Sequence, residues 1–380
     1  GTYNELVVMY EDVYLQGYGA PSVLINAVKR PGEKLQAWRD KVASIVTAPG
    51  TNYLLPGQVL NFDPANNEPG LLNTAEGPGI LVLADRRKWT PSRKPRIDGF
   101  GITGSDIGGA IVVNGNARAL EISNNKLFSN HGLYAGGIRV GHPDLFGADD
   151  NPIDANNWNM KVHHNFITQN GSTAQDGAGG IGLFSGSAGY EVTENYVCGN
   201  FAVGSGGGIG HLGLSAHPQR ANRIADNKVL FNQCFNQVPA SVSEGGGISI
   251  AGVVPPPNAA GGLTAGTGSV LIDSNRIHGN LAGSGDGGGI RLAYVNGQDV
   301  LNNPGKQDNW YTVQVFNNMI SNNVSGLAGG GIILKDTLKA GIIHNTIVHN
   351  DTTATAGEAF PRGVLFPSSR HPAEIGRAHV

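Results

Sequence analysis

The feature that most constrains this chain is a short phrase, apolar-x-x-Asn-x-apolar-x-x-Asn, which occurs seven times and is followed by Gly-Gly-Ile in the first six copies. Its two asparagines are always five residues apart, whereas consecutive copies lie 27 to 48 residues apart. A constant phrase with variable spacers indicates fixed strands joined by loops of variable length, as in a solenoid of stacked coils. The pairs are Asn125 and Asn130, Asn165 and Asn170, Asn195 and Asn200, Asn227 and Asn232, Asn275 and Asn280, Asn318 and Asn323, and Asn345 and Asn350.

Apolar residues alternate within each phrase, and the phrases are too short and too rich in Gly and Asn for helices. We therefore predict an all-β, right-handed parallel β-helix of about nine three-strand coils. Asn tolerates the left-handed backbone of a tight corner and can bond the same amide one coil along, which predicts an asparagine ladder at one corner. Its residues are Asn125, Asn165, Asn195, Asn227, Asn275, Asn318 and Asn345. The Gly-Gly-Ile glycines are expected to allow close packing and positive φ where the third strand begins.

The N-terminal part carries weaker copies of the same pattern. Residues 97–102 resemble one phrase, and a first coil is expected near Leu6. Between them, residues 33–46 have apolar residues at helical spacing, which predicts a short helix in an insertion at 30–79. Because a strand pattern resumes directly afterwards, we expect one β-helix domain over residues 1–374.

Composition limits the classes of partner. The formal net charge of −3 and the pI near 6.4 argue against nucleic-acid binding, and no apolar run approaches the ~20 residues of a membrane span. The two cysteines, Cys198 and Cys234, are expected on adjacent coils four positions apart, so two separate thiols and a bridge both stay open. Residues 375–380 match what a common DNA sequencing adapter encodes, which predicts a non-native tail.

The repeated phrase with its Gly-Gly-Ile element resembles bacterial secreted parallel β-helix proteins of the pectin-lyase-like superfamily, and is similar to the repeats of polymorphic outer-membrane proteins. The resemblance covers residues 97–350. It implies a secreted or cell-surface protein, with any signal peptide upstream, in a superfamily of polysaccharide lyases, hydrolases, epimerases and non-enzymatic surface proteins. His131-Gly132 and Asp149-Asp150 match phrases of polygalacturonase-like sites, but the Asn-Thr-Asp and Arg-Ile-Lys phrases are absent. The Asp-Pro-His-Glu phrase of alginate epimerases is absent as well.

Aligning the coils turns the sequence into columns of stacked side chains, ~4.8 Å apart. Long connections at 142–159, 252–269 and 294–312 are expected to wall a groove. Its floor would present Lys161, His163, Glu191, Arg223 and His211, and Trp158, Tyr294 and Trp310 would stack on sugar rings. The alternation of charge along the floor is equally typical of a stabilising charge ladder.

Two further groups of polar residues are expected to share positions on successive coils. His164, Glu194 and Asp226 share a corner on successive coils, which suits acid–base work or a cation as well as solvated turns. Glu244 and Asp286 occupy equivalent places before the third strand, where two carboxylates repel unless a cation intervenes. Either Arg291 or calcium would supply that charge, although two carboxylates alone seldom fill a calcium shell.

Three functions stay open at this stage. The first is a structural or polysaccharide-binding module without chemistry of its own, directed at a polysaccharide or a cell-surface glycan. The second is a polysaccharide lyase or glycoside hydrolase, which needs acid and base groups that converge on one sugar. The third is a stalk in a longer protein. No cofactor is expected, apart from the calcium considered above.

Overall fold

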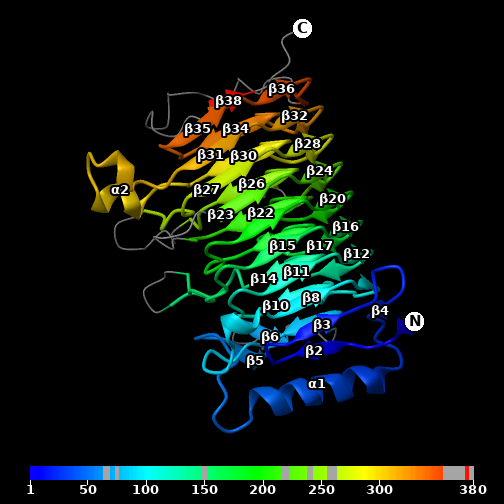
Figure 1. Cartoon of the computed structure of the whole chain (residues 1–380). Helices are drawn as coiled ribbons and strands as arrows, with labels where there is room; N and C mark the ends of the chain where they lie inside the picture. Colours follow the sequence, from blue (N-terminus) through cyan, green and yellow to red (C-terminus); the bar gives the residue numbers. More distant parts are fainter. Residues whose placement is uncertain are drawn as a thin grey trace.

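The computed structural model describes residues 1–62, 69–72, 77–147, 152–215, 222–237, 243–254, 263–353 and 373–375. Over these residues the chain winds into a column of stacked coils whose strands form long parallel sheets (Figure 1). The predicted all-β parallel β-helix is therefore confirmed. None of the helices in these ranges is long and apolar enough to span a membrane.

Each coil passes through three main sheets, named here sheets I, II and III in chain order. Sheet I contains β3 (Tyr14–Gln16), β8 (Arg96–Asp98), β11 (Glu121–Ser123), β15 (Lys161–His163), β19 (Glu191–Thr193), β23 (Asn222–Ala225), β27 (Val270–Asp273), β31 (Val313–Phe316) and β35 (Ala340–Ile343). Sheet II contains β1 (Thr2–Tyr3), β4 (Leu24–Asn26), β9 (Gly101–Thr103), β12 (Lys126–Phe128), β16 (Phe166–Thr168), β20 (Tyr196–Cys198), β24 (Lys228–Leu230), β28 (Arg276–His278), β32 (Met319–Ser321) and β36 (Thr346–Val348).

Sheet III closes each coil and leads into the next. It contains β2 (Val7–Met9), β7 (Ile80–Val82), β10 (Ile111–Val113), β14 (Ile138–Val140), β18 (Ile181–Leu183), β22 (Ile209–Leu212), β26 (Ile248–Ala251), β30 (Ile290–Ala293), β34 (Ile332–Lys335) and β38 (Ala373–Ile375). All of these pair in parallel except β38, which is antiparallel to β34. Ile375 of the expected tail thus belongs to β38, whereas residues 376–380 lie outside the described ranges.

We expected three strands per coil, but the seven repeat coils each have a fourth, two-residue strand between sheets II and III. These strands are β13 (His131–Gly132), β17 (Gly171–Ser172), β21 (Phe201–Ala202), β25 (Gln233–Cys234), β29 (Leu281–Ala282), β33 (Val324–Ser325) and β37 (Asp351–Thr352). Smaller elements lie outside the coils, namely β5 (Val59–Asn61), β6 (Gly70–Leu72), η1 (Pro91–Arg93), α2 (Gln298–Asn302) and η2 (Gln307–Asn309).

The first asparagine of each phrase takes part in a ladder of amide hydrogen bonds, and all of these asparagines except Asn345 are buried. At Asn227, Oδ1 accepts from the backbone N–H and the Nδ2 of Asn195, at 2.9 and 3.0 Å. Its own Nδ2 donates to the Val192 carbonyl at 2.8 Å and to Asn275 Oδ1 at 3.0 Å. The second asparagines form a separate ladder of the same kind, as Asn200 Nδ2 donates to Asn232 Oδ1 at 2.9 Å. Two ladders therefore fix two corners, where we expected one.

The left-handed backbone that we assigned to the ladder asparagines lies one residue earlier. Asn124, His164, Glu194, Asp226, Ser274, Asn317 and His344 precede the first ladder and have φ between 54° and 58°. Because the corner turns before the asparagine, the asparagine side chain can point inward and bond along the column.

The Gly-Gly-Ile glycines are needed for close packing, as expected, but not for positive φ. A Cβ on Gly208 would lie 2.7 Å from the carbonyl oxygen of Gly247 on the next coil. In the third to sixth copies the positive φ falls on the glycine before the motif, as at Gly206 and Gly245, with φ of 81° and 74°. Both requirements exclude larger side chains at this corner.

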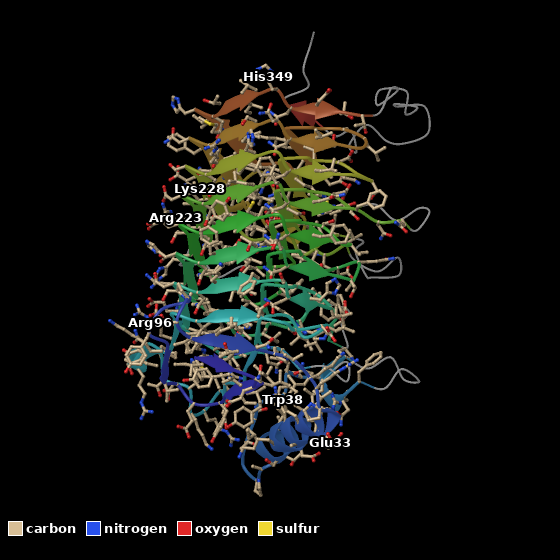
Figure 2. All side chains as sticks on the ribbon, turned by 90° about the vertical axis from the view of Figure 1, so that its right-hand side faces the viewer. Glu33, Trp38, Arg96, Arg223, Lys228 and His349 are labelled. Atoms are coloured by element: carbon tan, nitrogen blue, oxygen red, sulfur yellow. The ribbon has the colours of Figure 1, made fainter. Side chains whose placement is uncertain are left out.

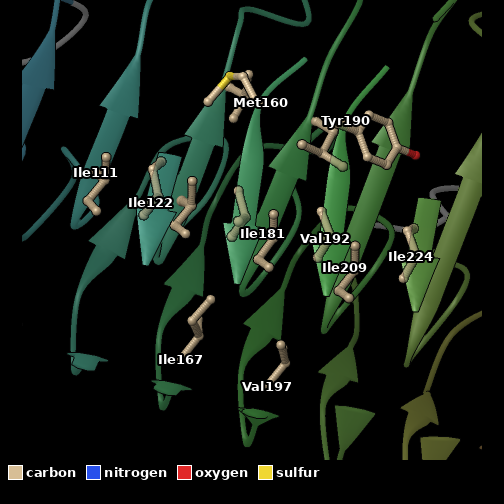
Figure 3. Close-up of a cluster of buried hydrophobic side chains, with 14 of the residues drawn as sticks. Ile111, Ile122, Met160, Ile167, Ile181, Tyr190, Val192, Val197, Ile209 and Ile224 are labelled. Atoms are coloured by element: carbon tan, nitrogen blue, oxygen red, sulfur yellow. The ribbon is translucent and has the colours of Figure 1, made fainter. Parts of the chain in front are cut away.

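One apolar core runs along the interior of the column, because the inward residues of sheets I, II and III stack coil upon coil (Figure 3). At the N-terminal end, helix α1 (Gly32–Val46) lies against the solenoid (Figure 1). Its buried face of Trp38, Val42 and Ile45 packs with outward residues of sheet III, among them Leu81 and Val112. The helix covers apolar surface that would otherwise be exposed.

Candidate functional site

The outward residues of sheet I form the charged column that the alignment predicted, and its charges are paired. Lys161 Nζ lies 3.4 Å from Glu191 Oε2, and Arg223 Nη2 lies 3.2 Å from Asp226 Oδ2. Glu121, one coil before Lys161, forms an ion pair with Arg96. Arg96 and Arg223 lie on the same side of the column (Figure 2). These contacts agree with a stabilising charge ladder.

His211 does not join this column, although we placed it on the same groove floor. It pairs in register with Leu183 and Ile250 and faces the interior, where it is 3% exposed. Its Nδ1 lies 2.8 Å from the Tyr190 hydroxyl, and its Nε2 lies 2.8 Å from the Gly213 carbonyl. Burial lowers the pKa of His211 to about 4. The physical reason is strand alternation, because Ile209 faces inward, Gly210 outward and His211 inward again.

A cleft of about 400 Å³ lies instead over the outer face of sheet III. Each of the three long connections contributes to its lining, through Asp144 and Phe146, through Val253 and Val254, and through Tyr294. The connections fold over sheet III because each begins where a strand of that sheet ends. Loop length thus located a groove, but on a different face from the one we expected.

The cleft exists because the outward column of sheet III has small residues in its middle. Arg139, Gly182, Gly210, Ser249 and Arg291 follow one another in register on β14, β18, β22, β26 and β30. Gly210, Ser249 and Arg291 line the cleft. Gly210 and Ser249 have no long side chain, so they leave the floor of the cleft open.

Charged groups meet at one end of this hollow. Glu244 is 4% exposed and forms a close ion pair with Arg291, while Lys335 Nζ lies 3.5 Å from its other oxygen. Burial and the nearby Glu244 carboxylate raise the pKa of Asp286 to about 6. Arg291, one of the two countercharges expected from the sequence, contacts Glu244. Among the described residues, no group of three or more His, Cys, Asp or Glu side chains is arranged to hold a metal ion.

Two more carboxylates, those of Asp144 and Asp176, line the cleft. Desolvation and the charge of Asp144 raise the pKa of Asp176. Asp144 also accepts a hydrogen bond from the Tyr134 hydroxyl. Strand register could not identify these two acids as site residues, because they lie in connections between strands.

The three aromatic residues expected to stack on sugars do not come together. Tyr294 lines the cleft directly after β30. The Arg118 guanidinium lies over the Trp158 ring, with its carbon 4.5 Å from the ring centre. The Trp310 indole donates to the Asn303 carbonyl at 2.8 Å, within the loop of α2 and η2. Neither tryptophan is among the residues that line this cleft.

Other candidates have separate surroundings. His163 and His164 contact each other and two glutamates at the corner after β15. Cys198 lies in sheet II and buried Cys234 in the short corner strands, and both are free thiols. His131 and Gly132 form β13, whereas Asp149 and Asp150 lie outside the described residues.

Comparison with family models, curated proteins and solved structures finds no match to the chain.

Proposed function

We propose that this protein is a secreted or cell-surface glycan-binding module that holds a neutral oligosaccharide in the cleft over sheet III. The observation that carries the proposal is the hollow itself, with a floor of small residues and walls from all three long connections. Clefts of this size with a few convergent polar groups are typical ligand sites. The charged side chains of the sheet I column are instead paired with one another.

The lining of the cleft favours a neutral ligand. Asp144 and Asp176 provide carboxylates that accept hydrogen bonds from sugar hydroxyls, whereas the charge of Glu244 is already paired with Arg291 and Lys335. An anionic glycan would meet a net negative site. Tyr294 and Phe146, which is 40% exposed, provide aromatic surface for the apolar faces of sugar rings.

A binding screen tests this proposal. We expect soluble neutral oligosaccharides to bind in isothermal titration calorimetry and uronate oligosaccharides to bind weakly, with or without calcium. Tyr294→Ala should weaken binding about tenfold, the equivalent of ~1.4 kcal/mol of lost aromatic contact. Phe166→Ala, which removes an exposed ring from sheet II, is the control and should leave affinity unchanged. Binding that survives Tyr294→Ala but not Phe166→Ala would contradict the assignment.

A second candidate, a glycoside hydrolase, is favoured by one observation. Asp144 and Asp176 both line the cleft, and burial together with the charge of Asp144 raises the pKa of Asp176. Hydrolysis of a glycosidic bond uses one protonated and one ionised carboxyl group. Reducing-sugar release that is lost in both Asp144→Asn and Asp176→Asn would establish hydrolysis. Unsaturated products would indicate a lyase, and binding without any product supports the binding module.

A further inference from the structure

Two neighbouring histidines at the corner after β15 have an unusual relation to each other. His163 is the last residue of β15, and His164 has the left-handed φ of 55° that turns the chain. This turn brings the Nδ1 atoms of the two rings to 2.9 Å. The His164 side chain is 50% exposed, so the pair is accessible from solvent.

A carboxylate lies on the far side of each ring. His163 Nε2 is 3.1 Å from Glu121 Oε1, and His164 Nε2 is 2.9 Å from Glu194 Oε2. An ionised carboxylate only accepts hydrogen bonds, so each Nε2 must carry the proton and donate it. Each neutral ring then presents the lone pair of Nδ1 to the other ring. Two lone pairs at this distance repel each other unless a proton or a metal ion is shared between them.

We propose that His163 and His164 chelate a divalent transition metal ion through their Nδ1 atoms, with copper(II) as the preferred ion. A histidine ligand whose other nitrogen donates to a carboxylate is the usual arrangement around protein-bound metals. Here both rings have it, and the two carboxylates come from the coils before and after β15. The remaining coordination positions are left to water.

The distance between the two Nδ1 atoms can be compared with the spacing that each coordination geometry needs. With metal–nitrogen bonds of about 2.0–2.1 Å, two ligands at a right angle have their nitrogens about 2.9 Å apart, whereas a tetrahedral angle needs about 3.4 Å. The observed 2.9 Å fits the right angle. Tetragonal geometry with nitrogen ligands is preferred by copper(II), which is also the strongest binder among the divalent ions of this series.

Titration of the full chain with copper(II), followed by calorimetry and electron paramagnetic resonance, tests the proposal. We expect one tight site whose spectrum shows two coupled nitrogens. His163→Asn and His164→Asn should each remove the two-nitrogen spectrum and lower the affinity at least about 100-fold. Glu194→Gln keeps both ligands but weakens the acceptor behind His164, so we expect a loss of about 10- to 100-fold. Zinc should bind more weakly than copper(II) in every variant that retains both histidines.

The chain contains a matched control. His344 occupies the same corner position on a later coil, with a φ of 57°, but follows Ile343 instead of a histidine. His344→Asn should leave the copper affinity and the spectrum unchanged. Unchanged copper binding in His163→Asn, or a wild-type spectrum with a single nitrogen, would overturn the proposal. Thermal unfolding of each variant separates lost ligands from lost folding, and glycan binding in the cleft should be unaffected.

Discussion

The outer faces of sheets I and III are built by the same repeat in the same register, yet the cleft described above lies over sheet III. On sheet I, the outward positions of successive coils carry long charged side chains, such as Lys161 and Glu191, which pair along the column. On sheet III, the equivalent middle positions are Gly182, Gly210 and Ser249. The difference shows that a solenoid makes a cleft where its outward column carries small residues, while the loops beside that column supply the walls.

The two faces also differ in how their charges are solvated. Lys161 and Glu191 have side chains that are 52% and 46% exposed, whereas those of Arg291 and Glu244 are 10% and 6% exposed. Exposed ion pairs contribute little to stability, but breaking a buried one leaves an uncompensated charge in a poorly solvated place. The ion pairs of the two faces should therefore respond differently to mutation.

The largest effect is expected at the buried pair. Arg291→Ala leaves Glu244 with only the more distant Lys335, and we expect the free energy of unfolding to fall by about 3–5 kcal/mol in urea denaturation. A loss below ~1 kcal/mol would show that water reaches Glu244 freely, and would remove the distinction between the two faces.

A smaller, pH-dependent effect is expected at Asp286. Its pKa of about 6 in the folded protein lies above the ordinary value of 3.8, so ionisation of Asp286 costs free energy in the folded state. This cost is absent below about pH 4 and grows as the pH rises through 6. Asp286→Asn should therefore stabilise the protein by about 1–2 kcal/mol at pH 7–8 and by nothing at pH 4. Equal stabilisation at both pH values would contradict the raised pKa.

The smallest effect is expected on sheet I, which provides the control for the buried pair. Arg223→Ala breaks the contacts with Asp226 and Asp273, at 3.2 and 3.9 Å, but the arginine side chain is 37% exposed. We expect a loss of at most about 1 kcal/mol in the same denaturation experiment. A loss as large as that of Arg291→Ala would mean that the exposed ion pairs of sheet I stabilise the fold as much as the buried pair does.

The outward columns of the sheets could be predicted from the sequence because side chains alternate between the two faces of a strand. Period-two alternation placed the columns of sheets I and III in register, because one face of every strand is buried. Applied to β22, the same alternation puts His211 inside, so that error came from treating a polar residue as exposed. The fourth strands have only two residues, too few to show any period.

Other features carried no shared signal in the sequence. The left-handed position before the first ladder is occupied by Asn, His, Glu, Asp or Ser, so no residue type marks it. Asp144, Phe146 and Asp176 lie outside the strands, and their positions follow from how the connections fold over sheet III. The histidine pair was visible as neighbours in the chain, but the distance between its nitrogens depends on the turn at His164.

Hydroxyl-radical footprinting with a saturating neutral oligosaccharide from the binding screen tests the central claim most directly, because aromatic side chains report their own exposure. We expect the oxidation of Tyr294 and Phe146 to fall several-fold when the oligosaccharide binds. Phe166 and Phe231, exposed at 48% and 58% on and beside sheet II, should keep their rates. Protection of Phe166, or unchanged oxidation of Tyr294 in a saturated complex, would contradict a binding site over sheet III.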